Sequence, residues 1–217
     1  VTERAPRTEV NLAFAVEDNL LRLSTVTIDG RPGRFFLGSA HGRTLLSPAF
    51  AGSNASRRYG LRLSDRETLT VEPLLFDLTG VGDAIIGFDA WSPHAVTVNY
   101  VSGLVTYQKY GIEPEGMTIF RYQDEPAIGL TVNGHAIYAA VDTAIPDTLV
   151  LPRGTAEGGR TRARVEIAGT VFEDIDVVLA DVSRARVGNR LLSKFLVSID
   201  YGRQQVGLWR DPRIPLE

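Results

Sequence analysis

Short apolar runs that end in turn-forming dipeptides recur along the chain. Residues 25–28 precede Asp29-Gly30, and residues 130–132 precede Asn133-Gly134. Such a run closed by Asp-Gly or Asn-Gly is a strong short-range signal for a β-hairpin. No long segment shows the apolar spacing of an amphipathic helix, so a mostly β protein is predicted. Two short segments are the best helix candidates, 190–194 and 51–59.

The two turn signals belong to a longer repeat. Residues 12–48 align without a gap with residues 116–152, and the turn and the apolar pattern agree in both. Residues 87–106 align in the same way with residues 188–207. Two blocks repeated in the same order indicate tandem duplication. We place the boundary in the connector 111–116, which gives two units, 1–113 and 114–217, each the size of a small β barrel.

The composition excludes several kinds of chemistry. The 217 residues contain no Cys, so disulfides, thiol catalysis and Cys-ligated metals are ruled out. Only three His occur, far apart and without metal-site spacing, and no metal or other cofactor is predicted. A net charge of −3 with scattered Arg residues argues against nucleic acid as a partner. No apolar run reaches the roughly 18 residues that a membrane-spanning helix needs.

One acidic residue stands in an unusual setting. Asp142 follows the apolar run 137–141 and precedes Thr143 and Ala144, after which a second apolar run begins. Small residues after an acid allow another backbone to approach closely, and the Thr143 hydroxyl can hydrogen-bond to a neighbouring segment. We therefore expect Asp142 to lie in a cleft rather than on an exposed strand end.

These motifs resemble those of the aspartic peptidase superfamily. Its strand-Asp-Thr/Ser-Gly signature is similar to residues 141–144, and its later apolar-apolar-Gly motif is similar to 85–87 and, less closely, to 186–188. The resemblance covers residues 12–210. It implies an all-β acid-protease fold, pepsin-like in its two lobes and retropepsin-like in its lobe length. The lobes would be six-to-eight-stranded, barrel-like and related by a pseudo-two-fold axis, with 1–113 as the first and 114–217 as the second.

The sequence departs from the family pattern at the position that matters most for hydrolysis. Gly38 stands in the first unit where Asp142 stands in the second. The resemblance implies that hydrolysis in this family uses two carboxyl groups about 3 Å apart, which share a proton and activate a water molecule. The resemblance thus predicts a protein that is inactive as a monomeric peptidase and whose interlobe cleft binds an extended peptide. Asp142 and Thr143 are the retained catalytic positions; the predicted binding positions are Gly38, Ser39, Ala40 and Ala144.

Two alternatives stay open. One is an active aspartic endopeptidase that pairs Asp142 with an unidentified acid or with Asp142 of a second chain, although a monomer is expected. The other is a scaffold in which the cleft is filled. Other residues near the motifs are interpreted as structural, namely Asp83, Asp89, Asp147 and His41. Glycines at 60 and 158–159 are candidate flap tips. The resemblance favours a periplasmic or secreted protein.

Overall fold

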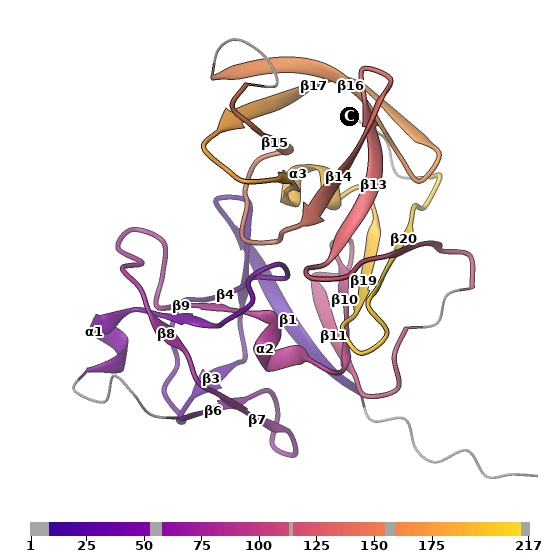
Figure 1. The fold of residues 1–217 in the computed structure, drawn as a ribbon. Coiled ribbons are helices and arrows are strands. Elements are labelled where there is room, and N and C mark those ends of the chain that lie inside the picture. Colours follow the sequence, from indigo (N-terminus) through magenta and orange to yellow (C-terminus); the bar gives the residue numbers. More distant parts are fainter. Residues whose placement is uncertain (1–8, 53–57, 113–114, 155–158, 214–217) are drawn as a thin grey trace, which may run out of the picture.

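The molecule is built almost entirely from β-strands (Figure 1). The structure, a computed structural model, describes residues 9–52, 58–112, 115–154 and 159–213. Helices within these ranges are four residues long each: α1 (Pro48–Ala51), α2 (Phe88–Trp91) and α3 (Asn189–Leu192). The predicted all-β class is confirmed.

Three sheets account for the strands (Figure 1). The longest sheet has eleven strands in the order β12 (Thr118–Arg121), β20 (Gln205–Trp209), β19 (Leu196–Asp200), β10 (Ala95–Asn99), β11 (Leu104–Gln108), β1 (Glu9–Glu17), β2 (Leu20–Leu23), β4 (Phe35–Leu37), β9 (Ala84–Ile86), β5 (Leu45–Leu46) and β8 (Leu74–Leu75). Six strands close a barrel in the order β13 (Ala127–Val132), β14 (His135–Val141), β18 (Ala185–Val187), β15 (Leu149–Pro152), β17 (Thr170–Ala180) and β16 (Arg160–Ile167). A small sheet contains β3 (Thr27–Ile28), β6 (Tyr59–Arg62) and β7 (Thr68–Val71).

The two predicted turns adopt the same backbone conformation. Asn133 and Gly134 have φ values of 49° and 83°, and they join β13 to β14 as a hairpin, as predicted. Asp29 and Gly30 have φ values of 49° and 73°. Asx-Gly is favoured here because both positions require a positive φ. The first hairpin is nevertheless short, because β3 pairs with β6 rather than with a long return strand.

The short helices differ in part from the prediction. Helix α3 overlaps the predicted segment 190–194. The second prediction, 51–59, is wrong at both ends: Ala51 ends α1, and Tyr59 begins β6, while residues 53–57 lie outside the described ranges. Helix α1 starts earlier because Ser47 Oγ accepts a hydrogen bond from the Phe50 N–H, a strong N-cap followed by a proline.

The repeated blocks meet each other in the middle of the long sheet. Strands β10 and β19 run antiparallel, with Thr97 opposite Ser198. Their hydroxyl oxygens are 2.8 Å apart. The two residues hold matching positions in the repeated blocks 87–106 and 188–207. The local two-fold relation between the halves therefore passes between these strands.

A second pairing is repeated beside the predicted site. Strand β4 runs parallel to β9 with Phe36 opposite Ile85, and β14 runs parallel to β18 with Ala140 opposite Arg186. The four residues hold matching positions in the repeats, which supports the duplication. The predicted division between residues 113 and 114 falls outside the described residues and stays a prediction.

The two halves differ in how far they close. In the second half, β17 is an unbroken strand of eleven residues between β15 and β16, and it completes the barrel. The matching stretch of the first half is split into β7 and β8 by Glu72 and Pro73. Proline has no N–H for a strand ladder. Among the described residues, therefore, only the second half forms a closed barrel.

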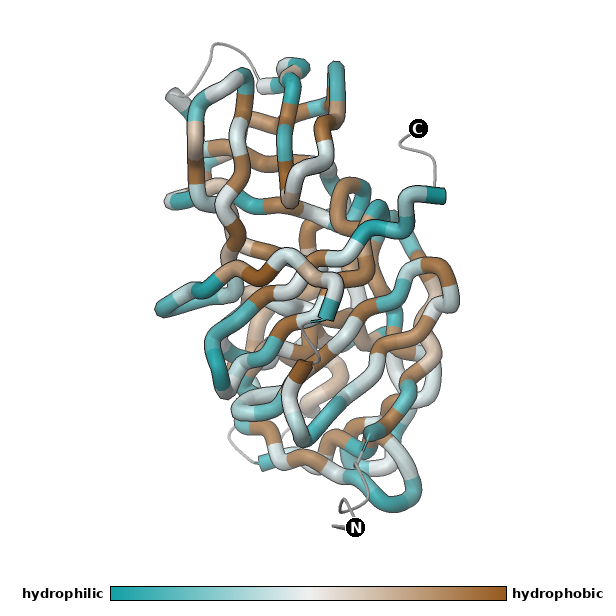
Figure 2. Tube along the Cα trace, turned by 90° about the vertical axis from the view of Figure 1, so that its right-hand side faces the viewer, coloured by the Kyte–Doolittle hydropathy of each residue, from teal (hydrophilic) through white to brown (hydrophobic). Residues whose placement is uncertain are grey.

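A continuous apolar core fills both halves. Apolar and polar residues alternate along many of the strands (Figure 2), and buried apolar residues from both halves form one cluster. Trp91, Tyr107 and Phe35 are the bulkiest fully buried side chains. No helix in the described ranges has the length and apolar character needed to cross a membrane.

Candidate functional site

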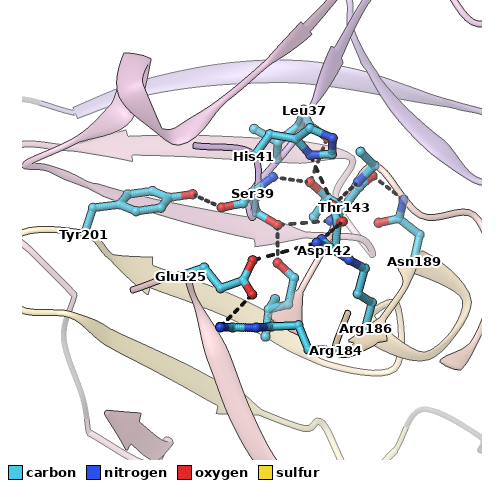
Figure 3. A network of polar contacts seen from close by, with 12 residues as sticks. Leu37, Ser39, His41, Glu125, Asp142, Thr143, Arg184, Arg186, Asn189 and Tyr201 are labelled. Carbon is cyan, nitrogen blue, oxygen red and sulfur yellow. Dashed lines mark hydrogen bonds and ion pairs between the residues drawn. The ribbon is translucent and has the colours of Figure 1, made fainter. Parts of the chain in front are cut away.

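Two loops from the two halves meet where β4 and β14 end (Figure 3). Gly38 leaves β4 with its N–H bonded to Ile86 O at 2.9 Å. Asp142 leaves β14 in the same way, with its N–H bonded to Val187 O at 3.0 Å. Because the neighbouring strands hold both loops identically, the next residues, Ser39 and Thr143, come face to face.

Ser39 and Thr143 form a reciprocal hydrogen-bond pair. The N–H of each donates to the hydroxyl of the other, both at 3.0 Å. The Thr143 hydroxyl donates to Leu37 O at 2.7 Å, and the Ser39 hydroxyl donates to Val141 O at 2.6 Å. Both side chains are fully buried. Each hydroxyl thus donates and accepts in a dry environment, which locks the two loops together.

Two further side chains brace the same loops. Tyr201 donates its hydroxyl to Ser39 O at 3.1 Å. Asn189, which is buried, donates to Thr143 O and to Asn19 O, both at 2.7 Å, and accepts from the Tyr100 hydroxyl at 2.8 Å. The backbone carbonyls of Ser39 and Thr143 therefore both accept a side-chain hydrogen bond.

The carboxylate of Asp142 is enclosed by donors and positive charge. Asp142 is only 1% exposed. Its Oδ2 accepts from Arg186 Nη1 at 2.6 Å, and its Oδ1 accepts from the Ala144 N–H at 3.0 Å. His41 Nδ1 lies 3.7 Å from Oδ1, beyond hydrogen-bond reach, and forms an ion pair when the imidazole is protonated. Both carboxylate oxygens are thus engaged.

These neighbours determine the charge of Asp142. Burial raises the pKa of its carboxyl group, but His41, the Ala144 N–H and the Arg186 guanidinium together lower it more, so that the net pKa lies below the ordinary value. The Asp142 side chain is therefore a carboxylate at neutral pH. In this environment it is a weak base, because a base with a depressed pKa gains little by taking a proton.

The pKa of Asp142 predicts how stability depends on pH. A carboxyl group whose folded-state pKa is below its unfolded value stabilises the fold above the unfolded pKa, and this contribution is lost as the pH falls through the folded one. We expect the free energy of unfolding, measured with urea, to decrease below about pH 4. In Asp142→Asn this acid-dependent loss should be smaller. The control Asp174→Asn removes an exposed carboxylate paired with Arg162 and should retain the wild-type slope; equal slopes in both variants would refute the assignment.

The opposite loop offers no carboxylate. Gly38 has no side chain, and a Cβ built there would lie 2.5 Å from Ile85 Cγ2 and 3.3 Å from His41 Nδ1. The residue of the second half that matches Ile85 is Arg186, so an apolar side chain in one half corresponds to a cation in the other. Glu125 approaches only the far side of Arg186, with 3.9 Å between Oε2 and Nη2. Among the described residues, the basic side chains within ion-pair distance of Asp142 are His41 and Arg186.

The remaining candidates lie near this junction or serve local structure. Ala40 is buried and Ala144 is partly buried, one on each loop. Asp89 Oδ1 accepts from both the N–H and the hydroxyl of Thr44 at 2.8 Å. Asp83 Oδ2 accepts from the Arg34 N–H at 2.8 Å, so neither acid faces Asp142.

One of the two predicted flap tips is wrong. Gly60 lies inside β6, and the turn of that hairpin comes later, between β6 and β7. Gly158 lies outside the described ranges and Gly159 directly precedes β16, so the second flap tip stays a prediction. Gly60 is not a turn signal here, because a strand interior also accepts glycine where a side chain of the neighbouring strand, here Thr68, packs against the backbone.

The architecture matches a known class of structures. The chain is similar to the crystal structure of the aspartic proteinase from Irpex lacteus, with a TM-score of 0.60 and 10% identity, over 94% of this chain and 98% of that one. The fold is that of a pepsin-like aspartic proteinase. No family model matches the sequence, and no curated protein is significantly similar to it. The pepsin-like fold class is thus established, whereas the state of the catalytic positions depends on the geometry above.

Sequence reasoning misses two residues that the structure brings to Asp142. The sequence pattern makes His41 a structural residue, and Arg186 only a poor match to an apolar motif. The second carried a usable signal. An arginine in a strand that the repeat makes equivalent to Ile85 is out of place unless an acid lies beside it, and Asp142 was the available acid.

Proposed function

We propose that this protein is a non-hydrolytic member of the pepsin-like fold, in which the junction of the two halves binds an extended peptide without cleaving it. The observation that carries the proposal is the ion pair of Asp142 with Arg186, at 2.6 Å, opposite a bare Gly38. The charged partner of this carboxylate is thus a cation, and the position of a second acid is held by a glycine.

The chemistry of peptide hydrolysis explains why this matters. A shared proton between two acids raises the pKa of one of them, so that one acid donates while the other accepts. At this site, the charges around Asp142 lower its pKa instead. Asp142 Oδ2 also accepts from the Arg186 guanidinium at 2.6 Å, so a water molecule at this carboxylate would lie beside a cation rather than beside a second acid. General acid or base help from one properly placed group contributes about 10²–10⁴-fold, and here neither role is filled.

Peptide binding is supported by what the junction keeps. The Ser39–Thr143 pair and its braces hold both loops in one conformation. The side chains of His41 and Arg186 remain 29% and 23% exposed, so part of each lies at the surface where a peptide could contact it. A preorganised polar junction can bind a main chain without reacting with it.

The experiment compares cleavage with binding in the same preparation. We expect wild-type protein and Asp142→Asn to leave a mixture of casein-derived peptides intact from acid to neutral pH, as read by mass spectrometry. Retention of peptides on immobilised wild-type protein should fall in a variant that changes the partly exposed His41 to Ala. Cleavage by the wild type that disappears in Asp142→Asn would reject the proposal in favour of a peptidase. Absence of retained peptides would reject the binding function.

The arrangement of the junction argues against a second chain as the source of another acid. Two Asp142 side chains could meet only if Ser39 and Thr143 separated, which breaks four buried hydrogen bonds. Light scattering at the assay concentration should therefore report one chain. A dimer that cleaves peptides would favour the endopeptidase instead.

A further inference from the structure

One strand in the closed barrel of the second half is paired along only part of its length on one side. Strand β14 has seven residues, but β18 pairs only with Ala139–Val141 at its end. On the same side, the preceding part of β14, from His135 to Tyr138, has no partner strand among the described residues. In Figure 1, β13 lies on one side of β14 and β15 lies on the other.

The backbone of this segment directs hydrogen-bonding groups to the open side. The Val141 N–H bonds to Pro126 O, toward β13, whereas the Asp142 N–H bonds to Val187 O, toward β18. Since backbone groups alternate along a strand, those of Ala136 and Tyr138 face the β18 side. An open strand edge of this kind is a template for another polypeptide.

A hollow of about 480 Å³ lies beside this edge. Its apolar lining includes Ile137 of β14, Leu151 of β15 and Ala185 of β18. The ring of Tyr138, which is 76% exposed, stands at its border. The hollow occupies the place that a longer β18 would have filled. Its volume is in the range of ligand-binding pockets.

The charges at the rim favour an acidic occupant. The basic residues that line the hollow are His135 and Arg184, and no carboxylate is among the lining residues. Arg184 Nη1 contacts Glu125 Oε1 at 3.0 Å, yet its side chain remains 53% exposed. A ligand with a carboxylate beside its apolar groups would complement this rim.

From these observations we infer that the barrel of the second half binds an extended peptide segment of a partner protein by strand addition to β14. The segment places apolar side chains in the hollow beside Ile137 and Leu151, and an acidic side chain near His135 and Arg184. Only a polypeptide can use the open backbone groups of Ala136 and Tyr138. A second copy of the chain fits poorly, because two concave surfaces of the same kind leave the hollow unfilled. The site is separate from the junction at Asp142 and does not depend on its function.

The test selects peptides on the full chain from a phage-displayed random library and measures their affinity by fluorescence anisotropy. Ala136→Pro removes an N–H that faces away from β13, so it should weaken binding about tenfold or more. Ala136→Val keeps this N–H and serves as the matched control. Arg184→Glu should also weaken the selected peptides, and Arg184→Lys should restore most of the affinity. Hydrogen exchange should show new protection at Ala136 and Tyr138 on binding.

Each other outcome contradicts the inference. Peptides whose affinity changes with Asp142→Asn but not with Ala136→Pro bind the junction instead. Selection of no peptide would show that the edge has no such ligand. If Ala136→Pro does not fold, Arg184→Glu and the exchange measurement decide in its place. A dimer in light scattering that Arg184→Glu dissociates would make the occupant a second copy.

Discussion

Arg186→Met should destabilise the protein by about 3–5 kcal/mol at neutral pH, because it removes the guanidinium that lies closest to a buried carboxylate. Asp142 is 1% exposed, and Arg186 Nη1 is its nearest charged donor, at 2.6 Å. Methionine keeps most of the stem volume, so packing changes little. Urea unfolding at constant pH measures the change in the free energy of unfolding.

A second substitution separates the lost charge pair from lost packing. In the double variant Arg186→Met/Asp142→Asn no buried charge remains, and we expect it to recover much of the stability that Arg186→Met loses. Arg162→Met is the matched control, because Arg162 pairs with Asp174 on the exposed face of the barrel, where water and salt screen an ion pair and it contributes little. If Arg186→Met were no worse than Arg162→Met, the ion pair would not be a structural requirement, and Asp142 would be available for chemistry.

The sequence predicted the fold well because local and repeated signals agreed. The Asn133-Gly134 turn, the apolar strands and the duplicated blocks all favour the same β architecture, and each depends on short-range chemistry. The incomplete closure of the first half could not be predicted from periodicity. It depends on Pro73, whose effect is visible only when β7 and β8 are compared with the unbroken β17.

The candidate site was predictable in position but not in chemistry. Asp142, Thr143 and Ser39 follow from the motif and from its repeat, and the structure brings these three residues together. The neighbours of Asp142 do not follow from local pattern, because His41 and Arg186 reach it across tertiary contacts. A side chain that arrives from another strand is recognisable from sequence only when the strand pairing is already known.

Restoring the missing acid alone should not restore hydrolysis. Gly38→Asp introduces a Cβ 2.5 Å from Ile85 Cγ2 and a second carboxylate beside Asp142. We expect this variant to lose about 3–5 kcal/mol, since a buried acid enters a site that has no space for it and already holds one carboxylate. Arg186 would still hold Asp142 as an ion pair. The variant should therefore cleave no peptide at any pH, as measured with a fluorogenic peptide substrate.

The controls divide this effect into its causes. Gly38→Ala adds the same Cβ without a charge, so the difference between the Ala and Asp variants is the cost of the carboxyl group. Adding Ile85→Ala to Gly38→Asp relieves the crowding, and adding Arg186→Met as well removes the cation that lowers the pKa of Asp142. Only in this triple variant can two acids share a proton, because only there is each carboxyl group the other's main charged neighbour apart from His41. Cleavage by Gly38→Asp alone would show instead that Arg186 moves aside readily, and the ion pair would then be a resting state of a peptidase that lost a single residue.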